Sequence, residues 1–329
     1  MTNPRSERVR RVAALSGRSA RSRHGQFLVE GPQAVRELMR FAPERVRDVY
    51  VAEDAALQHH DVVEAALEAG VYLHEATAEV VRAMSPDAQG VLAVANIERT
   101  GRRAGAGAAA GAARRGGGDS GHEASSVGSA GHDDTPSPTP DLASVVASGP
   151  RLVALLVAAG DPGNAGTVIR SADAAGADAV LMGTGSVEVT NPKVVRATAG
   201  SLFHLPVVGG VEVEAAVSEL RAAGMQVLAA DGAGDWDLDE LADRALAQAH
   251  GLQLSVEGEL AATDLLAPDL AAPTVWLVGN EAHGLTAAQR SLADAVVRVP
   301  VHGAAESLNL ATAAALCLYA SARAQRREV

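Results

Sequence analysis

The sequence predicts an α/β protein in which a small α/β domain precedes a larger domain with a mostly parallel sheet and helices on both faces. Three observations lead to this prediction. Short apolar runs alternate with longer helical patterns in both halves of the chain, and a stretch poor in large apolar residues separates the halves. A length of 329 residues with 47% hydrophobic content is also enough for two cores. Alternation of this kind is typical of parallel sheets covered by helices.

Residues 1–98 form the first predicted domain. Short runs with β-branched residues predict its strands, and apolar residues at every third or fourth position predict its helices. We expect strands at residues 26–31, 46–52, 71–73 and 90–97, and helices at residues 33–41, 62–69 and 78–84.

The N-terminal segment of this domain is rich in arginine. Residues 1–25 carry seven Arg and one Glu, and Val9, Val12 and Leu15 follow helical spacing. We therefore expect a short amphipathic helix within residues 3–24. Its basic face, which includes Arg23, is explained equally well by solvation and by contact with RNA.

Residues 99–149 have a different composition, in which Gly, Ala, Ser, Pro and Asp dominate. Such a segment buries too little apolar surface to offset the entropy of ordering its backbone. We therefore predict a disordered linker.

The second domain is expected over residues 150–329. An acidic insert at about residues 232–273 interrupts it, and we expect this insert to be mobile and peripheral, with at most one helix at its start. For the rest we expect strands at residues 152–157, 179–182, 204–208, 226–230, 274–278 and 296–301, and helices at residues 166–175, 192–199, 213–223 and 308–323.

The net charge of −12 by itself argues against a nucleic-acid partner. The acidic excess is local, however, because residues 231–270 carry ten acidic side chains and one Arg. The local field decides which partner a surface attracts, so the overall charge does not exclude RNA.

Cys317 is the only cysteine, which excludes an intrachain disulfide and suits a reducing cytoplasm. The longest apolar runs are too short to span a bilayer, and the N-terminus lacks the apolar core of a signal peptide. We expect a cytoplasmic protein without a membrane partner. His283 and His302 have no neighbours at metal-ligand spacing, so we predict no metal site.

Three strand–loop–helix pieces of the second domain carry unusual polar clusters. They span residues 155–170, 276–285 and 299–315. Open α/β sheets bind ligands beyond the carboxyl ends of their strands, so these loops are candidates for one shared site. None of them is a Gly-x-Gly-x-x-Gly loop, which argues against a nicotinamide-dependent dehydrogenase.

These clusters resemble the signature motifs of the SpoU (TrmH) family of RNA ribose methyltransferases, in the SPOUT class. The matching patterns are Asn164-x-Gly166-x-x-x-Arg170, Gly279-Asn280-Glu281-x-x-Gly284 and Ser307-Leu308-Asn309, in the family's order. The resemblance implies a deep trefoil knot, S-adenosylmethionine as cofactor, transfer of a methyl group to a ribose 2′-hydroxyl, and a homodimer. Residues 27–32 also resemble part of the ribosomal-protein-like domain of many such enzymes, which implies ribosomal RNA as the substrate.

The resemblance also implies roles for individual residues. Catalytic roles fall on Asn164, Arg170, Glu281, Ser307 and Asn309, and cofactor contacts fall on Gly279, Asn280, Val299, Val301, Leu308 and Asn309. Lys193 and Arg196 lie in a segment that resembles the part of the family's fold facing RNA.

Several of these residues have a second explanation. A guanidinium keeps its proton in proteins, so Arg170 suits clamping a phosphate and stabilising an alkoxide better than accepting a proton. Capping of a helix explains Ser307, an ion pair explains Glu281, and core packing explains the two valines. Surface charge and helix capping explain Lys193 and Arg196. A non-catalytic RNA-binding or ribosome-assembly factor with the same fold is the alternative function.

Overall fold

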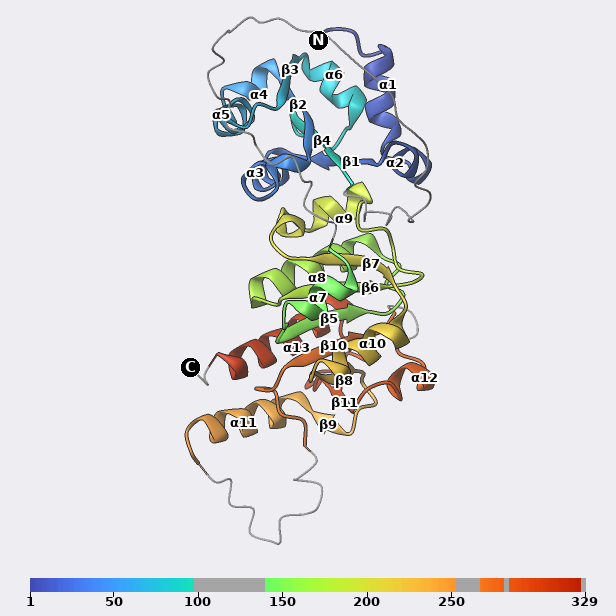
Figure 1. Ribbon diagram of the computed structural model, residues 1–329, viewed down its shortest axis with the longest axis vertical. Helices are drawn as coiled ribbons and strands as arrows, with labels where there is room; N and C mark the ends of the chain where they lie inside the picture. The colour runs from blue at the N-terminus through green and yellow to red at the C-terminus, as the bar shows by residue number, and fades with distance from the viewer. Residues whose placement is uncertain (98–139, 253–266, 281–283, 327–329) are drawn as a thin grey trace, which may run out of the picture.

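The computed structural model describes residues 1–97, 140–252, 267–280 and 284–326 (Figure 1). Two sheets lie along its long axis, and the N-terminal domain occupies one end. No helix in these ranges combines the length and the apolar character that crossing a membrane requires.

The N-terminal domain contains a four-stranded sheet in the order β1-β4-β2-β3. β2 pairs in parallel with β3, and β4 pairs antiparallel with both β1 and β2. The strands are β1 (Gln26–Glu30), β2 (Val46–Ala52), β3 (Tyr72–Ala76) and β4 (Val91–Asn96), and the helices are α3 (Pro32–Phe41), η1 (Pro43–Arg45), α4 (Glu53–Ala56), α5 (His60–Glu68) and α6 (Ala78–Met84). All four predicted strands and the three predicted helices of this domain are confirmed.

The arginine-rich segment forms two helices, α1 (Glu7–Ala14) and α2 (Arg18–His24), where we expected one. Gly17 separates them with an extended backbone, because glycine is unfavourable in the interior of a helix. Val9, Val12 and Leu15 are buried against the sheet, so the helical spacing of the apolar residues is confirmed.

The second domain is built on a seven-stranded sheet in the order β7-β6-β5-β10-β8-β11-β9, in which all pairings are parallel. The strands are β5 (Leu152–Leu156), β6 (Ala179–Gly183), β7 (Val207–Val211), β8 (Gln226–Ala230), β9 (Trp236–Asp237), β10 (Thr274–Val278) and β11 (Ala295–Arg298). The helices are α7 (Leu142–Ala147), α8 (Pro162–Ala175), α9 (Pro192–Ala197), η2 (Ser201–Phe203), α10 (Val213–Ala222), α11 (Leu238–Ala249), α12 (Ala287–Arg290) and α13 (Leu310–Gln325).

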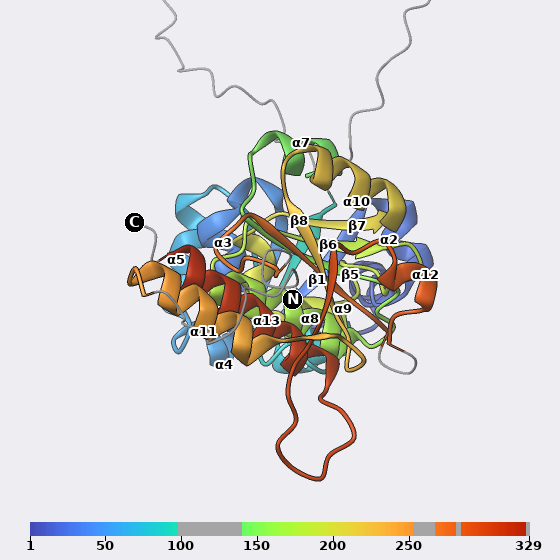
Figure 2. The ribbon, with the colours of Figure 1, turned by 90° about the horizontal axis from the view of Figure 1, so that it is seen from below.

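Helices cover both faces of this sheet. Figure 2 shows α11 and α13 on one face and α7 and α10 on the opposite face. Alternate residues of β5 enter different cores, because Ala154 packs with α8 and α13 whereas Leu155 packs with α10. The central strands are therefore apolar throughout, as a parallel sheet buried on both faces requires.

Two expectations about flexible segments are wrong within the described ranges. Residues 142–147, assigned to the linker, form α7, which the capping box of Asp141 and Ser144 starts and which Val145 anchors in the core. The acidic insert supplies the edge strand β9 and the helix α11, whose Leu238 and Leu241 are buried in the core shared with α13. Residues 98–139 and 253–266, which carry the rest of both predictions, lie outside the described residues.

Two further boundaries differ from the prediction. The strand expected at residues 204–208 is β7 at Val207–Val211, because Pro206 lacks the N–H that strand pairing needs and η2 occupies the preceding turn. The last helix begins at Leu310, two residues later than expected.

The N-terminal domain packs directly on the second domain. Val195, Leu202 and Phe203 belong to the same buried cluster as Phe27 and Leu38 of the N-terminal domain. Ion pairs join Arg21 to Glu188 and Arg196 to Glu30 beside this apolar contact, and the ring nitrogens of His204 lie within hydrogen-bonding distance of Glu37 and Asp173.

Candidate functional site

The first two motifs follow neighbouring strands at one edge of the sheet. β5 and β10 pair in parallel with Leu156 opposite Val278, so both chains leave the sheet at the same level. The Val157 N–H donates to the Val278 carbonyl at 2.8 Å and extends the pairing by one residue. Strand pairing alone therefore brings the loop before α8 beside the loop that starts at Gly279.

A side-chain hydrogen bond joins these two loops. The Asn280 amide donates to the Ala158 carbonyl at 2.8 Å. Ala158 has a φ of 51°, in the left-handed region that non-glycine residues rarely adopt. The second motif thus holds an unusual turn of the first.

Gly279 allows the second loop to close on itself. A Cβ atom at this position would lie 2.4 Å from the carbonyl carbon of Gly284, so a larger residue would open the loop. Asn280 and Gly284 exchange two backbone hydrogen bonds, of 3.1 and 2.9 Å. Glu281 lies outside the described residues.

The first motif lies on a helix, where we expected a loop as far as residue 166. Asp161 caps α8 by accepting a hydrogen bond from the Asn164 N–H at 2.7 Å, and Pro162 occupies the first helical position. The Asp-Pro pair is a sequence signal for this start. Gly166 serves helix packing, because a Cβ atom there would lie 2.4 Å from the Ala197 Cβ on α9.

Asn309 connects the third motif to the first. Its side-chain oxygen accepts from the N–H groups of Ala311 and Thr312 and caps α13. Its amide nitrogen donates to the Asn164 side-chain oxygen at 2.9 Å. The expectation that Ser307 caps this helix is wrong, since Asn309 does so and Ser307 is exposed.

Residues 301–308 offer unpaired main-chain groups beside this contact. They form no helix or strand, and they make no backbone-to-backbone hydrogen bond within the described ranges. Val299 and Leu308 are half-buried, and 40% of Val301 is exposed.

Arg170 lies two turns along α8 from Asn164. Its side chain is exposed and makes no hydrogen bond or ion pair with any residue that the structure describes. The guanidinium is therefore available to an anionic ligand.

Comparison with known proteins identifies the family. Residues 151–319 match the sequence model of the SpoU rRNA Methylase family. The chain belongs to this family. Residues 6–93 match the model of an MRM3-like substrate binding domain.

Two curated relatives of this SpoU protein carry specific names. A 23S rRNA (guanosine(2553)-2′-O)-methyltransferase of Bacillus subtilis is 38% identical over 169 residues, which cover 51% of this chain and 57% of the relative. A 23S rRNA (uridine(2479)-2′-O)-methyltransferase of Streptomyces viridochromogenes is 36% identical over 167 residues, which cover 49% of each chain. The chain spans about half the length of these relatives.

A solved structure matches nearly the whole chain. The SpoU methyltransferase AviRb from Streptomyces viridochromogenes, in complex with the cofactor AdoMet, superposes with a TM-score of 0.66 at 25% identity. The match covers 98% of this chain and 100% of that one. The match therefore extends over both domains of this chain.

The three predicted RNA contacts of this SpoU protein differ in their surroundings. Lys193 and Arg23 are exposed, and their side chains make no hydrogen bond or ion pair within the described residues. Arg196 is engaged inside the protein, where it pairs with Glu30 at 2.6 Å and with Asp87 at 2.8 Å. This contact favours the structural explanation for Arg196.

Proposed function

We propose that this protein is an S-adenosylmethionine-dependent RNA methyltransferase that methylates a ribose 2′-hydroxyl in ribosomal RNA. The hydrogen bond between Asn309 and Asn164 carries the proposal, because it joins the third motif to the first, and the hydrogen bond from Asn280 to the Ala158 carbonyl joins the second motif to the loop before the first. The names of the curated relatives and the AdoMet bound to AviRb support the reaction and the cofactor.

The donor set at the sheet edge fits this cofactor. The main-chain groups of residues 301–308 can read the edge of an adenine, and Val299, Val301 and Leu308 can line its faces. Gly279 and Asn280 form the neighbouring wall. When bound, S-adenosylmethionine supplies a methyl group that its positive sulfonium activates.

Arg170 acts on the RNA in this proposal. Its protonated guanidinium binds a phosphate next to the target ribose and donates to the 2′-oxygen as negative charge develops there. Asn164 precedes Arg170 by six residues on the same helix, and Asn309 holds its side chain. We assign Asn164 to positioning the same nucleotide. Both residues lie on α8, so a rigid helix sets their spacing. Glu281 and Ser307 keep their proposed roles in the same site.

RNA reaches the site across the N-terminal domain, with Arg23 and Lys193 as exposed phosphate contacts. A deep trefoil knot and a homodimer are parts of the same proposal and rest on the family resemblance. Light scattering of the purified protein tests the homodimer, and a monomer at the assay concentration would contradict it.

Transfer of tritiated methyl groups to ribosomal RNA, followed by nucleoside analysis, tests the reaction. We expect 2′-O-methylated nucleosides from the wild type. Arg170→Ala should lower the rate about 100-fold to 1000-fold, as loss of one charge-stabilising donor does in other enzymes. Cofactor affinity, measured by calorimetry, should stay unchanged.

Arg323→Ala is a matched control. Arg323 is also exposed, but it lies in the last turn of α13, at the opposite end of that helix from Asn309. It should keep full activity. A methyl group found only on a base would contradict the 2′-O assignment. RNA binding without any cofactor binding would favour the non-catalytic alternative.

A further inference from the structure

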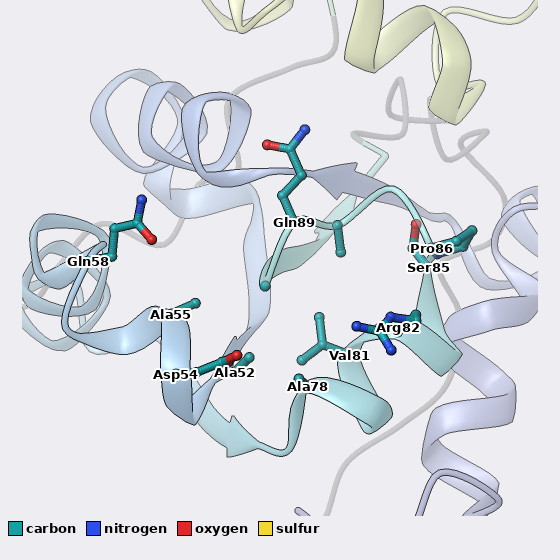
Figure 3. Close-up of a pocket in the computed structure, with 12 residues that line it drawn as sticks. Ala52, Asp54, Ala55, Gln58, Ala78, Val81, Arg82, Ser85, Pro86 and Gln89 are labelled. Carbon is teal, nitrogen blue, oxygen red and sulfur yellow. The ribbon is translucent and has the colours of Figure 1, made fainter.

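A second cavity lies in the N-terminal domain, away from the candidate active site. It has a volume of about 320 Å³ and opens between α4, α6, the end of β2 and the loop of residues 85–90 (Figure 3). Small apolar residues form much of its wall, and they are Ala52, Ala55, Ala78, Val81 and Ala88. This size lies at the lower end of ligand pockets and suits one ring system.

Besides Ser85, four polar side chains line the same cavity. Asp54 and Gln58 come from α4 and the turn after it, Arg82 comes from α6, and Gln89 comes from the loop before β4. Figure 3 shows Arg82 extending toward Val81, whereas the exposed Gln89 side chain points away from Val81 and Ala78. None of the four makes a hydrogen bond or an ion pair with a residue in the described ranges. Their donors and acceptors are therefore free for a ligand.

The backbone at Gln89 is strained. Its φ is 50°, which costs a residue with a Cβ atom about 1–2 kcal/mol. The loop holds this form through backbone hydrogen bonds, from Val91 to Ala88 and from Ala52 to Gly90. The side chain of Gln89 contributes no bond to the fold, so stability does not explain a glutamine at this position.

The second domain fixes the position of this loop. The Ser85 hydroxyl donates to Glu30 at 2.6 Å and accepts from the Asp87 N–H at 3.1 Å. Arg196 on α9 pairs with both Glu30 and Asp87. A ligand held by the loop would therefore have a defined position relative to the second domain.

We propose that this cavity binds a single unstacked base of the RNA substrate, at a nucleotide other than the methylated one. The inference rests on the proposed function in taking RNA as the ligand. A base has flat apolar faces and an edge with both donors and acceptors, and proteins read RNA sequence mainly on such unstacked bases. Gln58 supplies donors and acceptors, Arg82 donates and Asp54 accepts, and Gln89 adds donors and acceptors once its exposed side chain rotates toward the cavity. The carboxylate of Asp54 disfavours a phosphate, which carries only acceptors and negative charge.

Fluorescence anisotropy with the full chain tests the assignment. The two probes are a labelled single-stranded RNA of mixed sequence and the same ribose–phosphate chain without bases. Gln58→Ala and Gln89→Gly should each weaken binding of the RNA by about threefold to tenfold and leave binding of the abasic chain unchanged. Gln248→Ala, which changes an exposed glutamine on α11 at the far end of the molecule, should alter neither (Figure 1).

Gln89→Gly separates binding from folding. Glycine adopts a positive φ without steric cost, so this variant should melt at a higher temperature while it binds RNA more weakly. Unchanged RNA binding in both variants, or an equal loss on the two probes, would overturn the assignment.

The methyl-transfer assay distinguishes this inference from the proposed function. Base-dependent binding in a protein that transfers no methyl group would leave the cavity assignment standing and remove the enzymatic proposal. An active enzyme whose RNA binding ignores both substitutions would overturn the cavity assignment alone.

Discussion

At the scale of single residues, Asn309 has two separable tasks. Its oxygen caps α13, and its amide nitrogen reaches Asn164 on α8. Serine is also a good N-cap residue, but its side chain is too short to reach Asn164. We expect Asn309→Ser to unfold in urea within about 0.5 kcal/mol of the wild type, whereas Asn309→Ala should lose about 1 kcal/mol.

Both variants should lose methyl transfer to the same extent, because both lack the link to Asn164. The comparison is decisive for the site, since capping alone would leave Asn309→Ser fully active. An active serine variant would remove the contact between the two asparagines from the mechanism.

Cys317 predicts how stability depends on pH. Complete burial raises the pKa of its thiol from 9.0 to about 12. Above pH 9 the unfolded chain therefore loses this proton while the folded chain keeps it, and stability falls as pH rises. The slope approaches about 1.4 kcal/mol per pH unit. Urea unfolding between pH 9 and pH 10 should show it, before Tyr50, whose pKa burial raises from 10.0 to about 12, adds its own loss.

Cys317→Ala should flatten this slope, and a slope unchanged by the substitution would assign it to other groups. The wild-type thiol should also resist alkylation at pH 8 until the protein is unfolded.

The sequence identified the polar residues of the site better than their contacts. Ser307 and Asn309 are both capping residues two positions apart, and helical spacing alone does not choose between them. Only the contact with Asn164, 145 positions away, shows why the asparagine is used. Arg196 is a similar case, because its partner Glu30 lies 166 positions away and makes a predicted RNA contact an internal one.

At the scale of elements, the acidic insert shows where composition misleads. Its charge suggested a peripheral segment, yet Leu238, Leu241 and Ala245 recur at helical spacing and are buried in the core. This pattern was visible in the sequence and carries more information about packing than net charge does. The pairing of β9 with β11 was not visible, because a two-residue strand has no periodicity.

Leu241→Ala tests whether α11 supports the fold. The side chain is 1% exposed, so its truncation should cost about 2–5 kcal/mol in urea unfolding. Leu252→Ala is the control, because 65% of that side chain is exposed and its loss should cost far less. Equal effects of the two substitutions would show that α11 is peripheral to the fold, as its composition suggested.

At the scale of the whole molecule, the alternation of patterns predicted both sheets, and the three motifs predicted a shared edge. Strand order did not follow, because β10 inserts between β5 and β8 through pairings that no local pattern encodes. The contact between the domains did not follow either. Val195 and Phe203 read as ordinary apolar residues of the second domain, although they complete the core of the first.

This shared core predicts that the two domains unfold together. Val195 on α9 is fully buried in the cluster that contains Phe27 and Leu38, so the N-terminal domain loses part of its core if the domains separate. Multidomain proteins often unfold in steps, but a shared apolar core couples the steps. Calorimetry of the wild type should therefore show one thermal transition.

Val195→Asp should split this transition, because an unpaired carboxylate cannot stay in the shared core and the domains must part to hydrate it. Val217→Ala is the control, since Val217 is equally buried but packs only within the second domain. It should lower the melting temperature and keep a single transition. Two transitions in the wild type, or one in Val195→Asp, would show that the core shared through α9 does not couple the domains. In that case α9 would not fix the cavity near Gln89 relative to Arg170, and another rigid contact between the domains would have to do so.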